Sequence, residues 1–164
     1  MNQFRDVFNC QKAYFATGMT RSYDWRVDQI DRVRQMVAEN EAALQAAMAA
    51  DFKTAIQETV FETLAEVREA EFQKSQLREW MKPVEEPVPR FLAETGHKGV
   101  VYQEPYGVAL IVGPSNGPLT LLLRPALCAL AAGNTCVLKL SPATAVTTAG
   151  IHPHPLAHRE VRAV

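Results

Sequence analysis

The sequence predicts an α/β fold in which N-terminal helices are followed by the start of a parallel sheet. Over residues 1–82 the apolar side chains recur at the spacing of an α-helix. Between residues 107 and 140, two short apolar runs flank a longer apolar segment, and glycines and prolines mark the turns. That order of strand, turn, helix and strand is typical of a βαβ crossover. The chain therefore divides into a helical region (1–82), a first βαβ part (83–150) and an irregular tail (151–164).

In the helical region, residues 4–15 form one amphipathic pattern that ends near Gly18, and Ser22 is suited to cap the next helix. Two further apolar stripes follow, and we expect both to face the core. Glu58, Glu62 and Glu66 are expected on the solvated faces. The second stripe consists of Val27, Ile30, Val33, Val37, Leu44 and Met48, and the third of Ile56, Val60, Leu64 and Val67. Three prolines between residues 82 and 89 end this region.

The second half contains three predicted strands and one helix. Val100–Tyr102 is a short strand, and the apolar runs Val108–Val112 and Thr135–Lys139 are expected to be buried on both faces of a sheet. A right-handed crossover makes the last two strands parallel neighbours.

The helix between these two strands covers residues 119–132. Pro118 lies near its first turn and Gly133 at its C′ position, whereas Pro125 is expected to weaken or kink it.

Composition excludes several classes of function. The chain has 164 residues, 48% of them apolar and 21% charged, with a net charge of −1, so no basic field favours nucleic acid. Arg124 and several prolines interrupt the most apolar stretch, so no membrane span is expected. An odd number of widely spaced cysteines is no disulfide framework and favours a reducing compartment, and hence a cytoplasmic location.

Two polar residues follow the carboxyl ends of the predicted parallel strands, where ligands bind in open α/β sheets. Asn116 lies in the turn after Val112, and its amide could donate to a developing oxyanion or could simply suit a turn that needs left-handed backbone geometry. Lys139 ends the second strand and could reach a nucleotide's ribose or phosphate, or could emerge into solvent.

Other patterns carry less chemistry. Neither standard glycine-rich phosphate motif is present. Cys128 and Cys136 are interpreted as small core residues. His152, His154 and His158 are separated by prolines and lack a carboxylate or cysteine to complete a metal site, so no metal is expected.

Two segments resemble the aldehyde dehydrogenase family. QEPYGVALIVGPSNGP (103–118) is similar to the family's E-P-x-G-V and G-P-W-N-x-P signature, and AAGNTCVLK (131–139) is similar to its A-x-G-N-x-x-V-x-K strand. The helical half looks like the shorter class that includes fatty-aldehyde and benzaldehyde dehydrogenases. The likeness runs from about Phe4 to Gly150 and implies an incomplete Rossmann-like fold.

The resemblance implies NAD- or NADP-dependent oxidation of an aldehyde to a carboxylic acid. It assigns oxyanion stabilisation to Asn116 and ribose binding to Lys139. The other cofactor-binding positions that it implies are Val112, Gly113, Pro114 and Ser141. Two departures, Ser115 in place of the family's aromatic residue and Pro142 in place of an acidic one, imply weaker nucleotide binding.

The family's pyrophosphate-binding glycines, catalytic glutamate and nucleophilic cysteine lie downstream of the matched region. We therefore expect this chain alone to be inactive and to bind NAD or NADP weakly or not at all. Two alternatives stay open. One is a non-catalytic fragment that docks on a full-length homologue, or forms a dimer or other oligomer, through an exposed sheet edge. The other is an unstable product.

Overall fold

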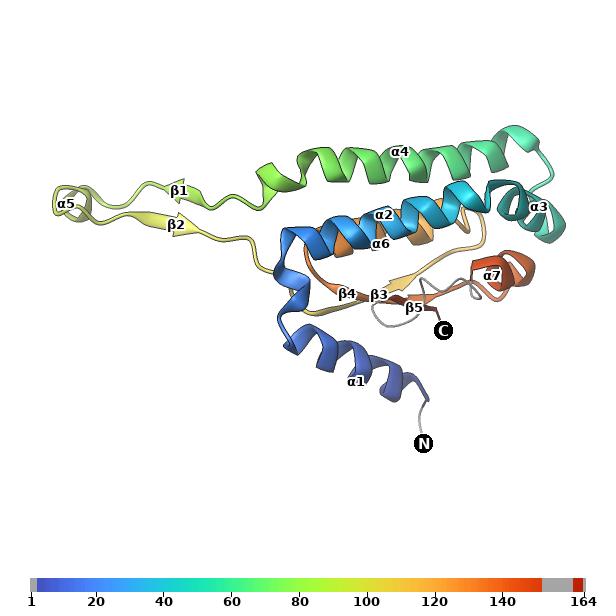
Figure 1. Ribbon diagram of the computed structural model, residues 1–164, viewed down its shortest axis with the longest axis horizontal. Coiled ribbons are helices and arrows are strands. Elements are labelled where there is room, and N and C mark those ends of the chain that lie inside the picture. Colours follow the sequence, from blue (N-terminus) through green and yellow to red (C-terminus); the bar gives the residue numbers. More distant parts are fainter. Residues whose placement is uncertain (1–2, 152–160, 164) are drawn as a thin grey trace.

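The computed structural model describes residues 3–151 and 161–163. Helix α1 (Gln3–Ala16) lies on one side of a small sheet, and α6 (Thr120–Ala131) packs on the other side. Helices α2 (Tyr23–Glu39) and α4 (Ile56–Trp80) pack against each other and on α6, which gives the body its layers (Figure 1). The mixed helix and strand architecture confirms the predicted fold class.

Short elements complete the helical region. A 3₁₀ turn, η1 (Met19–Arg21), joins α1 to α2, and α3 (Glu41–Asp51) precedes α4. Ser22 caps α2 as predicted, because its hydroxyl accepts a hydrogen bond from Trp25 N at 3.1 Å. The chain reverses after α1 at Gly18, whose φ of 76° is accessible to glycine without a side-chain clash.

The predicted βαβ unit is confirmed. Strands β3 (Val108–Val112) and β4 (Thr135–Lys139) are parallel neighbours, and α6 connects them. The helix continues through Pro125 and ends as predicted before Gly133, whose φ is 88°. After β4 the chain forms α7 (Ala145–Ile151), which packs against α3.

The main core lies between the sheet, α6 and α2. It contains most of the second predicted stripe, with Ile30, Val37 and Met48 fully buried. From the βαβ unit, its buried members include Ile111, Leu122, Leu127, Leu130, Cys136 and Leu138.

The buried face of α4 differs from the prediction. Ile56, Val60 and Leu64 are exposed. The face that packs inward carries Thr59, Glu62, Thr63, Glu66, Ala70, Gln73 and Leu77. Polar pairings explain part of this orientation: Thr63, for example, bonds to Glu41 of α3 and Glu62 to backbone groups of α6. The expectation that Glu62 and Glu66 lie on a solvated face is therefore wrong.

A hairpin-like arm extends from the body (Figure 1). Strands β1 (Val84–Glu86) and β2 (Gly99–Val101) are antiparallel, and the short helix α5 (Arg90–Ala93) lies between them. The predicted strand at 100–102 thus begins one residue earlier and ends before Tyr102.

Two further expectations about the sheet are corrected. Strand β3 is not buried on both faces, because the side chains of Leu110 and Val112 are 67% and 58% exposed. No described element covers that part of the sheet. Within the tail predicted to be irregular, Val161–Ala163 forms β5, parallel to β4. The predicted histidine cluster, His152, His154 and His158, lies outside the described residues.

Candidate functional site

The carboxyl ends of β3 and β4 meet at one edge of the sheet. Val112 is the Cα partner of Lys139, and Gly113 N donates to Lys139 O at 2.9 Å. The turn that follows β3 and the loop that follows β4 therefore leave the sheet side by side. This arrangement brings the segments that carry Asn116 and Lys139 to the same edge, as the sequence predicted.

Asn116 lies on the surface of the turn. Its backbone oxygen accepts a hydrogen bond from Lys53 Nζ at 2.8 Å, and its side chain is exposed. No non-glycine residue in the described part of the chain has a positive φ, so left-handed backbone geometry does not explain an asparagine here. The exposed amide can donate to an oxygen placed at this edge.

Lys139 is the only predicted site residue with a charge. Its ammonium is exposed and is 3.4 Å from Leu140 O. Because paired residues of neighbouring strands point to the same face of a sheet, Lys139 shares a face with the exposed side chain of Val112. An amine beside an apolar surface suits a ligand that has both a sugar and a flat ring.

The remaining predicted cofactor positions differ in accessibility. Pro114 is exposed and Ser141 is half-buried, with its hydroxyl accepting a hydrogen bond from Ala143 N at 3.2 Å. Gly113 is buried, and a Cβ at this position would lie 3.0 Å from Leu122 Cδ1. Close packing against α6 therefore accounts for this glycine.

Two residues that no sequence pattern marked as functional, Lys53 and Glu62, contact the turn that carries Asn116 and the start of α6. Glu62 of α4 is 3% exposed, and its Oε2 accepts hydrogen bonds from Leu119 N and Thr120 N at 3.0 and 3.1 Å. Its other oxygen pairs with Lys53, the same lysine that bonds to Asn116 O. Helical spacing alone gave no signal for these two residues, because their contacts with the turn and with the start of α6 span 57 to 63 residues of sequence.

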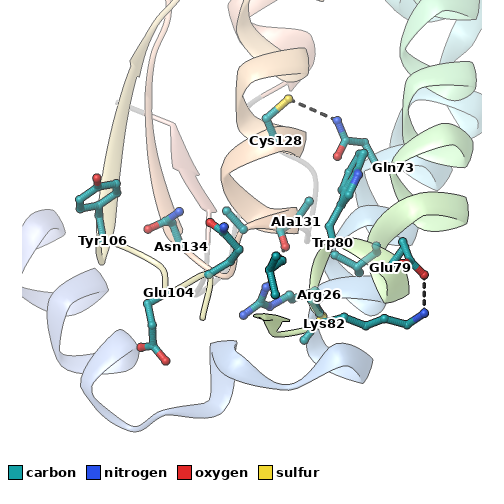
Figure 2. A pocket seen from close by; sticks show the side chains of 15 residues that line it. Arg26, Gln73, Glu79, Trp80, Lys82, Glu104, Tyr106, Cys128, Ala131 and Asn134 are labelled. Carbon is teal, nitrogen blue, oxygen red and sulfur yellow. Dashed lines mark hydrogen bonds and ion pairs between the residues drawn. The ribbon is translucent and has the colours of Figure 1, made fainter. Parts of the chain in front are cut away.

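A separate open cavity of about 770 Å³ lies at the opposite end of the sheet (Figure 2). Residues that precede β3 and β4, together with the ends of α4 and α6, form its walls, and none of the predicted site residues lines it. Arg26 is fixed at this cavity because its guanidinium donates to Ala131 O at 3.1 Å and to Thr20 O at 3.3 Å. The cavity is therefore distinct from the edge that carries Asn116 and Lys139.

Cys128 and Cys136 do not supply an activated thiolate. Burial raises the pKa of Cys136 to about 12, and its thiol lies in the core as predicted. Cys128 is exposed rather than buried, and its Sγ is 3.3 Å from Gln73 Nε2 (Figure 2). The pKa of Cys128 is raised as well, because neighbouring atoms partly shield its thiol from water and because the negative charge of Glu69 disfavours the thiolate. Both thiols therefore stay protonated near neutral pH.

Within the described residues, no group of three or more His, Cys, Asp or Glu side chains could hold a metal ion. Across the same residues, no helix has both the length and the apolar character to span a bilayer.

The known proteins that this chain resembles share one family. The family model described as "Aldehyde dehydrogenase family" matches residues 4–152. Aldehyde dehydrogenase family 3 member B1 of Rattus norvegicus is 35% identical over 148 residues, which are 90% of this chain and 31% of that protein. The dimeric NADP-preferring aldehyde dehydrogenase of Canis lupus familiaris is 32% identical over 142 residues, which are 86% of this chain and 31% of that protein.

Comparison with solved structures indicates the same family. The substrate-bound structure of Staphylococcus aureus AldH superposes with a TM-score of 0.91 and 25% identity, over all of this chain and 36% of that one. The chain spans about a third of the length of the curated relatives that it matches. Its two signature segments and its first βαβ unit lie within the matched region, and the chain belongs to the aldehyde dehydrogenase family.

Proposed function

We propose that this chain forms part of an NAD- or NADP-dependent site that oxidises an aldehyde to a carboxylic acid. We also propose that residues 1–164 alone do not catalyse this reaction. The observation that carries this proposal is the shared edge of β3 and β4, where Asn116 and Lys139 follow neighbouring strand ends. Matched relatives extend well beyond this chain, and neither Cys128 nor Cys136 has the lowered pKa that a nucleophile needs.

The residues at this edge fit a dinucleotide. Lys139 offers a cationic donor, and Val112 offers exposed apolar surface on the same face of the sheet. When bound, NAD(P)⁺ accepts the hydride that leaves the substrate carbon. In this proposal Lys139 and Ser141 hold the sugar and phosphate side, while Val112 and Pro114 contact the ring faces. Gly113 contributes by letting α6 approach the strand end closely.

Asn116 acts on the substrate. When a nucleophile adds to an aldehyde carbonyl, negative charge develops on the carbonyl oxygen, and a fixed N–H donor stabilises it by roughly 3–4 kcal/mol. An amide suits this role because it donates without ionising.

The proposal is tested at two levels. The purified chain is assayed with benzaldehyde or a long-chain aldehyde and each dinucleotide, and we expect no sustained cofactor reduction. Residues 4–150 are then placed in a full-length aldehyde dehydrogenase in exchange for the matching region. There, Asn116→Asp should lower kcat by about 10²- to 10³-fold, and Lys139→Met should raise KM for the dinucleotide. An active isolated chain, or a chimera that tolerates either substitution, contradicts the proposal.

A second candidate is a non-catalytic role in which the chain docks on a full-length homologue. The exposed apolar residues favour it: Leu110 and Val112 on β3, and Ile56, Phe61 and Leu64 on α4. Size-exclusion chromatography of the chain mixed with a full-length relative should then show co-elution. A chain that elutes separately at all concentrations argues against this role.

A further inference from the structure

The end of α3 and the connection from α3 to α4 contact two segments next to the proposed site, the turn that carries Asn116 and the start of α7. Figure 1 shows α3, the start of α4 and α7 gathered at one end of the molecule. At the end of α3, Asp51 accepts hydrogen bonds from Val146 N at 3.0 Å and from Thr147 N at 2.8 Å. Asp51 thereby fixes the start of α7, which follows the loop that carries Ser141.

Lys53 and Glu62 hold the other loop. The N-cap residue of α6, Leu119, has no side chain that could accept a hydrogen bond from the first free N–H groups of the helix. Glu62 supplies this acceptor from α4, since its Oε2 binds the N–H groups of Leu119 and Thr120. The positive end of the α6 dipole also stabilises the negative charge of this carboxylate.

The same carboxylate fixes the lysine that reaches Asn116. Lys53 pairs with Glu62 through Oε1, and the lysine side chain is only 12% exposed. Its ammonium also donates to the backbone oxygen of Asn116 at 2.8 Å. A continuous set of polar contacts therefore runs from Asn116 through Lys53 and Glu62 to the start of α6, and it fixes the turn at two points.

We propose that Lys53 and Glu62 are positioning residues for Asn116. They set the backbone of the turn and thereby the direction in which the Asn116 amide donates. This inference rests on the proposed function, because it assumes that Asn116 faces the substrate oxygen. A donor is effective only within about 2.7–3.1 Å of that oxygen, and a displacement of about 1 Å can cost about 100-fold in rate.

The contacts are tested first in the 164-residue chain by residue-resolved amide exchange. Glu62→Ala should speed exchange at Leu119 and Thr120 by about 10-fold or more, since it removes their acceptor. Val146 and Thr147, which Asp51 holds, should keep their protection. Glu58→Gln is the matched control, because Glu58 is exposed and its carboxylate lies 3.9 Å from the same lysine. Unchanged exchange at Leu119 and Thr120, or an equal increase at Val146 and Thr147, overturns the inference.

The positioning role is then tested in the active chimera described above. Lys53→Met should lower kcat by about 10- to 100-fold while KM for the dinucleotide stays constant, and Lys53→Arg should restore much of the loss. Glu58→Gln should leave both constants unchanged. A Lys53→Met chimera with normal kcat overturns the inference even though Asn116→Asp remains impaired. A chimera that tolerates Asn116→Asp refutes the proposed function instead, and amide exchange still decides whether Lys53 and Glu62 hold the turn.

Discussion

Glu66 should make the stability of this chain fall as the pH rises from 4.5 to about 7. Its side chain is fully buried between α4 and α6, and neither carboxylate oxygen has a hydrogen-bond partner of good geometry among the described residues, although the nearby Thr120 hydroxyl lowers its pKa. Burial raises the pKa of Glu66 from 4.5 to about 7, against the opposing effect of Arg124 at 3.5 Å. Nearby Glu69 and Glu62 raise this pKa further.

The sign and size of the effect follow from proton linkage. Below pH 4.5 the carboxyl is protonated in both the folded and unfolded chains, so its contribution is fully present. Between pH 4.5 and about 7 the unfolded chain loses this proton while the folded chain keeps it, and stability declines. Above pH 7 the decline stops. The pKa difference corresponds to a total loss of about 3 kcal/mol.

The substitution Glu66→Gln tests this reasoning because an amide stays neutral at every pH. We expect urea denaturation at pH 4 to give similar free energies of unfolding for the two proteins. At pH 8 the variant should be more stable by up to about 3 kcal/mol. Glu71→Gln is the control, since Glu71 lies exposed on the same helix, and its substitution should leave the difference between pH 4 and pH 8 unchanged. A difference between Glu66→Gln and the parent chain that is the same at pH 4 and pH 8 would refute the argument.

Three further predictions concern backbone geometry, exposed apolar surface and capping. Gly133→Ala should lower the free energy of unfolding by about 2 kcal/mol or more, because φ is 88° and the new methyl would lie 2.7 Å from Arg26 Nη2. Gly96→Ala shares a φ of 83° but meets nothing within 4 Å, so thermal denaturation should show a loss of only about 1 kcal/mol. Leu110→Lys should reduce self-association in analytical ultracentrifugation without unfolding the chain, whereas Ile111→Lys on the buried face should abolish the folded circular-dichroism signal. Ser22→Ala should cost about 1 kcal/mol in urea denaturation and Ser22→Asp almost nothing, and equal losses would argue against the cap.

Local patterns predicted the elements whose signals lie within a few residues. The apolar runs at 108–112 and 135–139, separated by one helix, were sufficient to predict a parallel pair of strands whose carboxyl ends lie side by side. The caps at Ser22 and Gly133 were predictable because each depends on a residue type suited to its own backbone position.

The orientation of α4 could not be read in the same way. Ile56, Val60 and Leu64 form a helical stripe, but a stripe shows only that a face is apolar and does not identify the surface that covers it. Glu62 is buried because the start of α6 needs an acceptor there, and that need arises only once the two helices are packed.

The sequence by itself determined the family of this chain, its βαβ unit and the shared end of β3 and β4 near which Asn116 and Lys139 lie, since short-range patterns encode all three. Only the tertiary structure decided that Lys53 and Glu62 hold the turn, that Glu66 is buried without a hydrogen bond, and that one face of β3 is open. The first of these features depends on polar contacts between residues far apart in the chain, which stabilise the buried Glu62 carboxylate. The other two depend on which elements pack over a given surface, and no local pattern reveals that.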